Sequence, residues 1–265
     1  MRVRPVARRG TVTAPSGPSA AAAAAAAEDG DCVGEAAIVA WEVVRSLATP
    51  AAVELVCRAN LPRCGLRAVK RFRLRRGDAR LRIVTTVVNE SGRDVSFSWT
   101  QHPALGGDLL TDDARLWLPE RQAGVTRRDG NANGNGSGSG SHADDSTSGT
   151  GLHSLRAGWT PISVLLPQPG TPDRFVTFAN ARAGEAALAS DRRGVGVRLR
   201  WDAAKFPHLW LWCARRGSIC CVTPEPSTTY LPELGADPRP EILRPLARGR
   251  SVAARLEMTV FAVAP

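Results

Sequence analysis

Short runs of alternating apolar and polar residues, separated by turn residues, dominate this chain of 265 residues. A period of two places successive side chains on opposite faces of a strand, and no segment has the longer period of an extended helix. We expect strands at 37–44, 52–59, 66–74, 79–88, 95–102, 162–166, 174–178, 194–201, 209–213, 219–223 and 251–263, and a short helical turn at 185–190. Many strands with short connections predict an all-β fold, a large antiparallel sandwich.

Two tracts have the composition of segments that do not fold by themselves. Residues 1–32 are rich in Ala, Arg, Ser and Pro, and residues 127–152 consist mainly of Asn, Gly, Ser and Asp. The first tract resembles an organellar transit peptide, although a disordered extension or a wrong start would have the same composition. The second predicts a flexible surface insertion. We therefore expect one domain over 33–265, interrupted once, in a protein of the cytoplasm or, if the first tract is a transit peptide, of an organelle.

The formal net charge of +10 does not by itself indicate a nucleic-acid partner. Only 2 of the 35 basic residues are lysines, Lys70 and Lys205, and such an excess of arginine is typical of coding bias. The arginines alternate with apolar residues in strand-like runs such as 71–75, a pattern typical of solvated strand faces. With no nucleic-acid-binding module in the sequence, we expect no nucleic-acid partner.

The sequence also predicts no membrane span and no cofactor. No apolar run approaches the ~20 residues that a membrane-spanning helix needs. The six cysteines contain no C-x-x-C pair, and the spacing of His208, Cys213, Cys220 and Cys221 fits no usual zinc site. We expect free, buried thiols and no bound metal.

Two strand ends carry the residues best suited to chemistry. His102 ends the run 95–102, in which Ser96, Ser98 and Thr100 share its face and apolar residues dominate the other. Glu225 lies between two prolines after the run 219–223, so its backbone is held extended. A histidine and a carboxylate together can move two protons near neutral pH, although either residue alone is more often structural or solvated.

Two tryptophans lie on one face of a neighbouring strand. Trp210 and Trp212 are separated by one residue and therefore point to the same side. Core packing is the simpler interpretation for at least one of them. The alternative is an apolar platform on which the C–H face of a sugar ring stacks.

Taken together, three stretches resemble the galactose mutarotase (aldose 1-epimerase) superfamily. The first runs from Leu81 through Asn89 to the His102-Pro103 end of a strand. The second runs from Phe206-Pro207-His208-Leu209-Trp210 through a hairpin to Pro224-Glu225-Pro226. The third, residues 246–251, is similar to the family's glycine turn before its last long strand.

The resemblance implies a β-sandwich of the supersandwich type that binds a small carbohydrate in a concave groove. His102 would match the family's general acid and Glu225 its general base, and Trp210, Trp212 and Asn89 would contact the sugar. The implied reaction interconverts the α and β anomers of an aldose or sugar phosphate and needs no cofactor. A non-catalytic carbohydrate-binding protein with the same groove is the alternative.

The N-terminal part departs from the family pattern. The family carries a second substrate-binding histidine there, in a glycine segment rich in Asn and His, together with a nearby arginine. Nothing before Asn60 matches that segment, and the first histidine of this chain is His102. We expect a chain that is shortened at this end, or whose start is replaced by low-complexity sequence.

Overall fold

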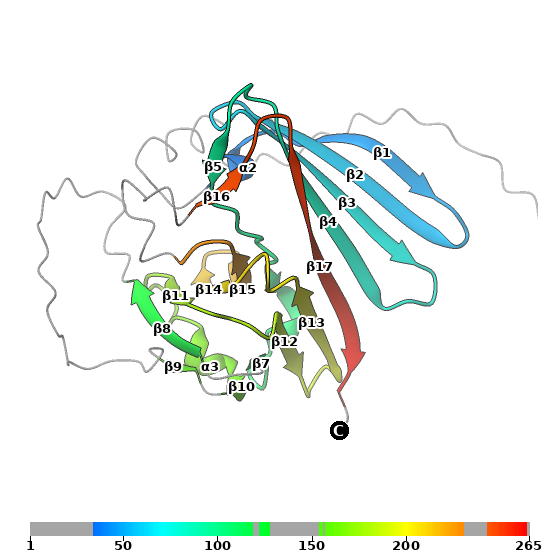
Figure 1. Cartoon of the computed structure of the whole chain (residues 1–265). Helices are drawn as coiled ribbons and strands as arrows, with labels where there is room; N and C mark the ends of the chain where they lie inside the picture. The colour runs from blue at the N-terminus through cyan, green and yellow to red at the C-terminus, as the bar shows by residue number, and fades with distance from the viewer. Residues whose placement is uncertain (1–33, 119–121, 128–153, 156, 231–242, 264–265) are drawn as a thin grey trace, which may run out of the picture.

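The structure is a computed structural model that describes residues 34–118, 122–127, 154–155, 157–230 and 243–263 (Figure 1). The described part of the chain is built mainly from antiparallel strands in a nine-stranded, a six-stranded and a two-stranded sheet. This confirms the prediction of an all-β antiparallel sandwich. Apart from Arg127, the tracts predicted as a low-complexity extension and a surface insertion lie outside the described residues.

The nine-stranded sheet forms one layer, and its first four strands follow each other in hairpins. Figure 1 shows these strands fanning out from the rest of the molecule, with β17 running beside them. In spatial order the strands are β1 (Glu42–Ala48), β2 (Ala52–Leu61), β3 (Leu66–Arg75), β4 (Arg80–Asn89), β17 (Ser251–Ala262), β13 (Val195–Trp201), β12 (Glu185–Ser190), β7 (Arg115–Leu118) and β10 (Gly158–Pro161).

The six-stranded sheet forms the second layer. Its strands, in spatial order, are β6 (Leu105–Gly106), β15 (Ile219–Ser227), β14 (His208–Arg216), β11 (Arg174–Phe178), β8 (Gln122–Arg127) and β9 (Ser154–Leu155). The two-stranded sheet pairs β16 (Arg244–Leu246) with β5 (Val95–Phe97). The described helical segments are α2 (Glu35–Ile38), α3 (Ile162–Leu165) and the 3₁₀ turn η1 (Gly107–Leu109).

One hydrophobic cluster joins the two large sheets. Leu209, Leu211 and Val222 contribute from one face of the six-stranded sheet, and Leu188 and Leu199 contribute from the nine-stranded sheet; all five are almost completely buried. Strand alternation then turns the neighbours of these residues on β14 and β15 away from the cluster. The fold thus leaves one face of the six-stranded sheet to side chains that the core does not use.

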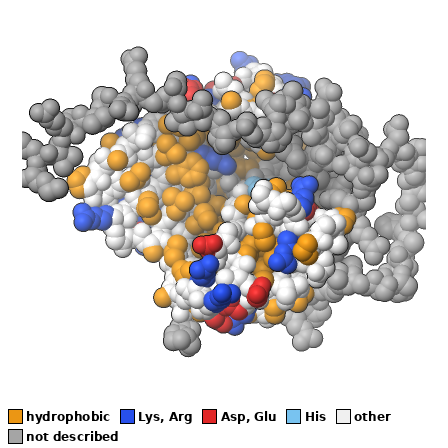
Figure 2. Space-filling model, turned by 180° about the vertical axis from the view of Figure 1, so that it is seen from behind, with side chains coloured by type: hydrophobic (Ala, Val, Ile, Leu, Met, Phe, Trp, Pro, Cys, Tyr) orange, Lys and Arg blue, Asp and Glu red, His pale blue; other side chains and the backbone are white. Residues whose placement is uncertain are grey.

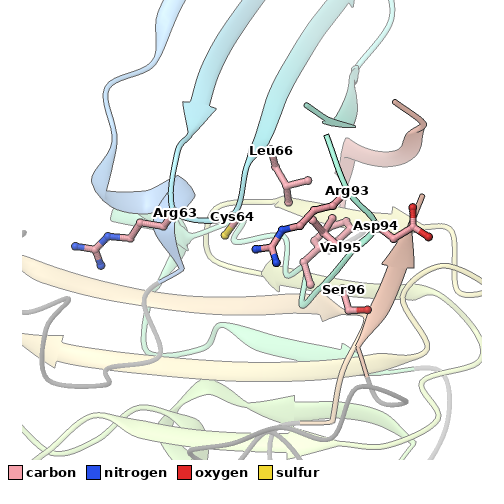
Figure 3. A pocket seen from close by; sticks show the side chains of 8 residues that line it. Arg63, Cys64, Leu66, Arg93, Asp94, Val95 and Ser96 are labelled. Atoms are coloured by element: carbon pink, nitrogen blue, oxygen red, sulfur yellow. The ribbon is translucent and has the colours of Figure 1, made fainter. Parts of the chain in front are cut away.

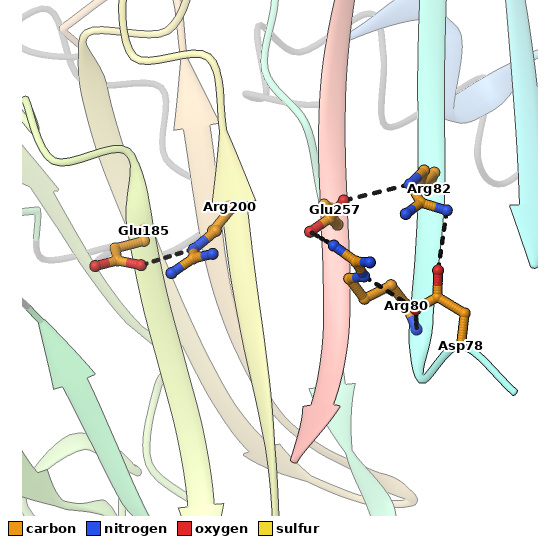
Figure 4. Close-up of polar contacts among 6 residues, drawn as sticks. All are labelled: Asp78, Arg80, Arg82, Glu185, Arg200 and Glu257. Carbon is orange, nitrogen blue, oxygen red and sulfur yellow. Dashed lines mark hydrogen bonds and ion pairs between the residues drawn. The ribbon is translucent and has the colours of Figure 1, made fainter.

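The outer face of the nine-stranded sheet carries ion pairs between arginines and carboxylates. Figure 4 shows Arg80 and Arg82 between Asp78 and Glu257, with the Arg80 Nε–Asp78 Oδ1 distance at 2.9 Å and the Arg82 Nε–Glu257 Oε2 distance at 3.5 Å. These arginine side chains are substantially exposed to solvent, so each pair adds little to stability. The interpretation of the arginine-rich runs as solvated strand faces is confirmed here.

Three local predictions were wrong. Residues 185–190 form β12, not a helical turn, because the segment lies fully paired between β13 and β7, where the sheet overrides the helix preference of Ala and Leu. Residues 162–166 contain helix α3 instead of a strand, with Ile162 and Leu165 buried one turn apart. The expected strand at 37–44 begins only at Glu42, after α2.

The strand expected over 95–102 is regular only as far as Phe97. The alternation of buried and accessible side chains nevertheless continues, because Trp99 and Gln101 are buried and His102 is accessible. Residues 99–101 run beside the end of β15, where the Gln101 amide donates to the Pro226 carbonyl at 2.9 Å. The ladder is incomplete because Pro103, Pro224 and Pro226 have no amide hydrogen to donate.

Asn89 fastens the end of β4 to two neighbouring turns. Its side-chain Nδ2 donates to the carbonyls of Arg93 and Leu246 at 2.7 and 2.9 Å. Its Oδ1 accepts hydrogen bonds from the Ser91 amide and hydroxyl. The residue is only 1% exposed, so these bonds replace water completely.

We predict that Asn89→Ala destabilises the fold by roughly 2–4 kcal/mol, because it leaves buried carbonyls without a donor. Chemical denaturation measures this loss, and Asn60→Ala, on the exposed part of β2, is the matched control with little expected change. An Asn89→Ala variant as stable as the control would contradict the structural role.

Candidate active site

The pairing of the His102 segment with β15 determines where His102 lies. An isolated bridge joins Thr100 to Ser227, and further along Leu105 pairs with Val222 in the same antiparallel register. Continuing the register from Thr100 by two residues sets His102 opposite Glu225. Directly opposed residues of antiparallel strands point to the same side, so the two strand ends are brought together.

The side chains of His102 and Glu225 are in contact, with 3.1 Å between His102 Nε2 and Glu225 Oε1. Their environments are opposite: the His102 side chain is 56% exposed and that of Glu225 only 5%. The two residues converge as expected, but they touch directly and leave no space for a sugar ring between them. A ligand therefore has to approach the pair from the exposed, histidine side.

The contact does not have the geometry of a hydrogen bond. Within the part of the chain that the structure describes, Glu225 Oε1 is a buried oxygen without a hydrogen-bond partner. An unpaired buried carboxyl oxygen is unfavourable unless the group is neutral or a ligand supplies the missing partner. The position is thus suited to a hydroxyl group that enters beside His102.

Burial determines the protonation of the pair. It raises the pKa of the Glu225 carboxyl to about 8, because the charged form loses its hydration. Burial also lowers the pKa of His102 below its ordinary value, and the charge of Lys70 lowers it further. At neutral pH the carboxyl therefore holds a proton and the imidazole is neutral, so the free pair contains one transferable proton.

Both predicted tryptophans lie on the Glu225 face of the six-stranded sheet. The register opposes Trp210 to Glu225 and Trp212 to Thr223. Trp210 is 6% exposed, packs on Phe175 and donates its indole hydrogen to the Thr229 carbonyl. Trp212 is half-buried and its ring centroid lies 5.6 Å from that of His102, so Trp212 is the accessible aromatic surface beside the pair.

Asn89 does not belong to this site. Both hydrogens and the oxygen of its side-chain amide form hydrogen bonds within the protein, as described above. The expectation that Asn89 binds substrate gains no support from these contacts, which are those of a residue that fastens a turn. An asparagine before a turn has the same sequence pattern whether it binds a ligand or fastens the turn.

The sequence analysis missed Lys70, whose ammonium is near enough to His102 to affect the imidazole pKa. Lys70 lies in β3 at the same parity as Leu66, Ala68 and Phe72, so it points to the apolar face of the strand. The arginines beside it point to the other face. This departure from an otherwise regular alternation is the signal that could have identified Lys70.

Figure 2 shows a hollow in the middle of one face of the molecule, with a histidine side chain visible in it. A separate pocket of about 350 Å³ lies between the turn before β3 and the strand β5 (Figure 3). Arg63, Cys64, Arg93 and Asp94 are among the residues that line this pocket, which includes neither His102 nor Glu225.

The described residues offer neither a metal-binding cluster nor a membrane-spanning helix. They contain no cluster of three His, Cys, Asp or Glu side chains placed to hold a metal ion. The described cysteines are all unpaired; Cys213 and Cys221 are buried as expected, whereas Cys64 is exposed. No helix of the described part is long and apolar enough to cross a membrane.

No protein-family model and no curated protein sequence matches the chain. Solved structures do match. A proposed aldose 1-epimerase from Klebsiella pneumoniae superposes with a TM-score of 0.56 at 13% identity, over 82% of this chain and 53% of its own. A proposed aldose 1-epimerase from Escherichia coli K12 gives 0.56 at 16% identity, over 87% and 71%.

A galactose mutarotase related enzyme from Lactobacillus acidophilus gives a TM-score of 0.55 at 16% identity, over 87% of this chain and 74% of its own. The chain thus spans about half of the first of these proteins and nearly three quarters of the others. At such low identity the likeness concerns the backbone and not the residues of the site. From the sheet order, the core and these superpositions, we conclude that this chain has the galactose mutarotase-like fold.

Proposed function

We propose that the protein is a mutarotase-type isomerase that interconverts the α and β anomers of an aldose or sugar phosphate. The observation that carries the proposal is the contact between His102 and Glu225, in which a buried carboxyl oxygen without a hydrogen-bond partner lies beside an accessible imidazole. Anomer exchange needs one group to take a proton and one to give a proton at neighbouring oxygen atoms. The superpositions with proposed aldose 1-epimerases support the same activity.

Ring opening follows from the protonation of the pair at neutral pH. The neutral His102 imidazole takes the proton of the C1 hydroxyl, and the Glu225 carboxyl gives its proton to the ring oxygen. The bond between C1 and the ring oxygen breaks with its electrons on the oxygen, while C1 becomes an aldehyde carbon. The hydroxyl and ring oxygens are both attached to C1, so two side chains in contact can serve both.

Ring closure returns both protons. Rotation about the C1–C2 bond presents the other face of the aldehyde, the former ring hydroxyl adds to C1, and the protons move back to Glu225 and away from His102. Each group therefore acts once as acid and once as base. For the opening step this order is the reverse of the roles implied by the family resemblance, because burial leaves the proton on Glu225 in the free protein.

Trp212 provides the platform for the sugar in this proposal. Its half-buried ring lies beside His102 and its indole nitrogen is held by Asp173 Oδ2 at 3.1 Å, so the ring plane is fixed. The C–H face of a pyranose can stack on such a ring while its C1 oxygen reaches the pair. Trp210 instead lies directly across from Glu225 on β14, and because it is buried and packs on Phe175 it offers no surface to the sugar.

A carbohydrate-binding protein without catalytic activity is the second candidate. It is favoured by the absence of any histidine before His102, because the resemblance implies a second substrate-binding histidine in that part. Such a protein would use the Trp212 platform and would bind either anomer without exchanging them. Measuring binding and exchange on the same samples separates the two functions.

We expect His102→Ala and Glu225→Gln each to slow anomer exchange by about 10²–10⁴-fold, because each variant removes one of the two proton carriers. Exchange is measured by NMR with a panel of aldoses and aldose phosphates, and sugar affinity is measured in parallel. Glu185→Gln, which breaks an ion pair with Arg200 on the nine-stranded sheet, is the matched control. Wild-type protein that binds a sugar but does not accelerate exchange would identify the second candidate.

The exchange rate should depend on pH as a bell. Activity needs one proton on the pair, so it falls as pH rises through about 8, where Glu225 loses its proton. The rate also falls at acid pH, below the ordinary pKa of histidine, because His102 then becomes protonated while Glu225 keeps its proton. The pair then holds two protons and has no base. Rates corrected for spontaneous exchange test this; a rate that still increases above pH 9 would contradict it.

Glu225 should also make stability depend on pH. Its pKa is about 8 in the folded protein and near 4.5 in the unfolded chain, so the folded state binds more protons between these values. The contribution is therefore fully present below pH 4.5 and is lost as pH rises through 8. We expect Glu225→Gln to unfold at a higher temperature than wild type at pH 9, with a smaller difference at pH 5. Equal melting temperatures at pH 9 would show that Glu225 is not buried as described.

A further inference from the structure

The inner face of the fanned strands is apolar except around one cation. The registers of β2, β3, β4 and β17 set alternate residues of the four strands on this face. All of them are apolar apart from Cys57, Thr85, Asn89 and Lys70. Lys70 is thus the only charged residue among them, whereas the outer face carries the arginines and their ion pairs.

Lys70 has no anion beside it among the described residues. Every ion pair found in that part of the chain involves another side chain, and the Lys70 ammonium instead lies 5.2 Å from the centre of the Trp41 ring. Burial lowers the pKa of Lys70, as it does for an ammonium that loses water and gains no counter-ion. The contact with the Trp41 ring offsets part of the cost of burial, but no carboxylate of the described residues neutralises the charge.

A second unsatisfied polar group lies directly across from Lys70. Thr85 is its cross-strand partner in β4, is 3% exposed, and its hydroxyl oxygen has no hydrogen-bond partner within the described residues. A buried hydroxyl without a partner is rare in folded proteins. Lys70 and Thr85 therefore place one positive charge and one unpaired hydroxyl side by side on an otherwise apolar sheet face.

Lys70 is within electrostatic reach of the candidate active site. Its positive charge contributes to the lowered pKa of His102, after the larger effect of burial. Figure 2 shows the apolar surface running up to the hollow in the middle of this face. A molecule bound at His102 and Glu225 can thus extend toward Lys70.

We propose that Lys70 and Thr85 form a subsite for an anionic group of the substrate, so that the preferred sugar carries a phosphate or a carboxylate. The ammonium supplies the positive charge, the Thr85 hydroxyl donates a hydrogen bond, and the anion provides the partner that both groups lack. The choice of substrate class rests on the proposed function, but the anion subsite does not depend on catalysis.

Four probes test the subsite: glucose, glucose 6-phosphate, glucuronate and inorganic phosphate, with affinity measured from tryptophan fluorescence at one fixed ionic strength. We expect at least one of the anionic sugars to bind roughly 10- to 100-fold more tightly than glucose, the range for hydrogen bonds to a charged group. Which of the two binds more tightly identifies the anion as phosphate or carboxylate. Binding of inorganic phosphate alone shows how much of the affinity the sugar supplies.

The chain offers a matched set of variants, since it has only two lysines. Lys70→Met removes the charge with little change in length and should abolish the preference for the anionic sugar, and Lys70→Arg should retain most of it. Lys205→Met removes the same charge from an exposed ion pair with Asp202 and should change nothing. The melting temperature of Lys70→Met is measured beside that of wild type, and a value close to wild type excludes unfolding as the cause of a lost preference.

A second measurement follows the ammonium itself. With ¹³C-labelled lysine, two side-chain signals titrate, and the Lys70→Met variant assigns them. Binding of the anionic sugar should raise the pKa of Lys70 and leave that of Lys205 unchanged, because a bound anion favours the charged form.

Equal binding of glucose and both anionic sugars, or no binding of any probe, would overturn the subsite. The same holds if Lys70→Met keeps the preference. Failure of the proposed function looks different: an anionic sugar would bind through Lys70, but its anomers would not exchange faster than in buffer. If glucose and its anionic forms bind with equal affinity and exchange their anomers at equal rates, the isomerase activity is supported and the anion subsite is contradicted.

Discussion

The antiparallel register between the segment 100–106 and β15 is the constraint on which the candidate site depends. His102 and Glu225 are 123 positions apart in the sequence. This pairing brings His102 Nε2 to 3.1 Å from Glu225 Oε1. A shift of one residue would turn one of the two side chains to the opposite face. The shared hydroxyl contact between Thr100 and Ser227, at 2.9 Å, helps to hold the register where prolines interrupt the ladder.

Burial without compensation is the second feature of the site. Among the described residues, one buried oxygen of Glu225 has no hydrogen-bond partner, and Lys70 lies on an apolar face with no anion beside it. A carboxylate and an ammonium could neutralise each other, but no ion pair among the described residues joins Glu225 to Lys70. Both lower the stability of the free protein, and a bound ligand with suitable hydroxyl and anionic groups would satisfy both. This pattern is typical of binding sites, where stability is lost to keep polar groups available.

The span of the chain matters for the interpretation of the site. It covers 53–74% of the three superposed proteins described above, so part of their structure has no counterpart among its residues. The sequence has no histidine before His102, and Lys70, on the inner face of β3, contacts the Trp41 ring. A site assembled from His102, Glu225, Trp212 and Lys70 would therefore select its ligand by charge and by aromatic stacking.

The sequence by itself determined the class of fold, most strands and the two residues that meet at the candidate site. Alternation is a local property, so 66–74, 174–178 and 251–263 could be assigned from neighbouring residues alone, and the same parity correctly set Trp210 and Trp212 on one face of their strand. It failed where the neighbours in space decide the structure, as at 185–190, where Ala and Leu are forced into the centre of a sheet. It also could not show how Asn89 is held, because the hydrogen bond from its side chain to the Leu246 carbonyl joins residues 157 positions apart. Only the tertiary structure decided that Lys70 has no counter-ion among the described residues, that His102 touches Glu225, and that burial keeps a proton on the carboxyl. Long-range pairing and loss of solvent cannot be read from local sequence.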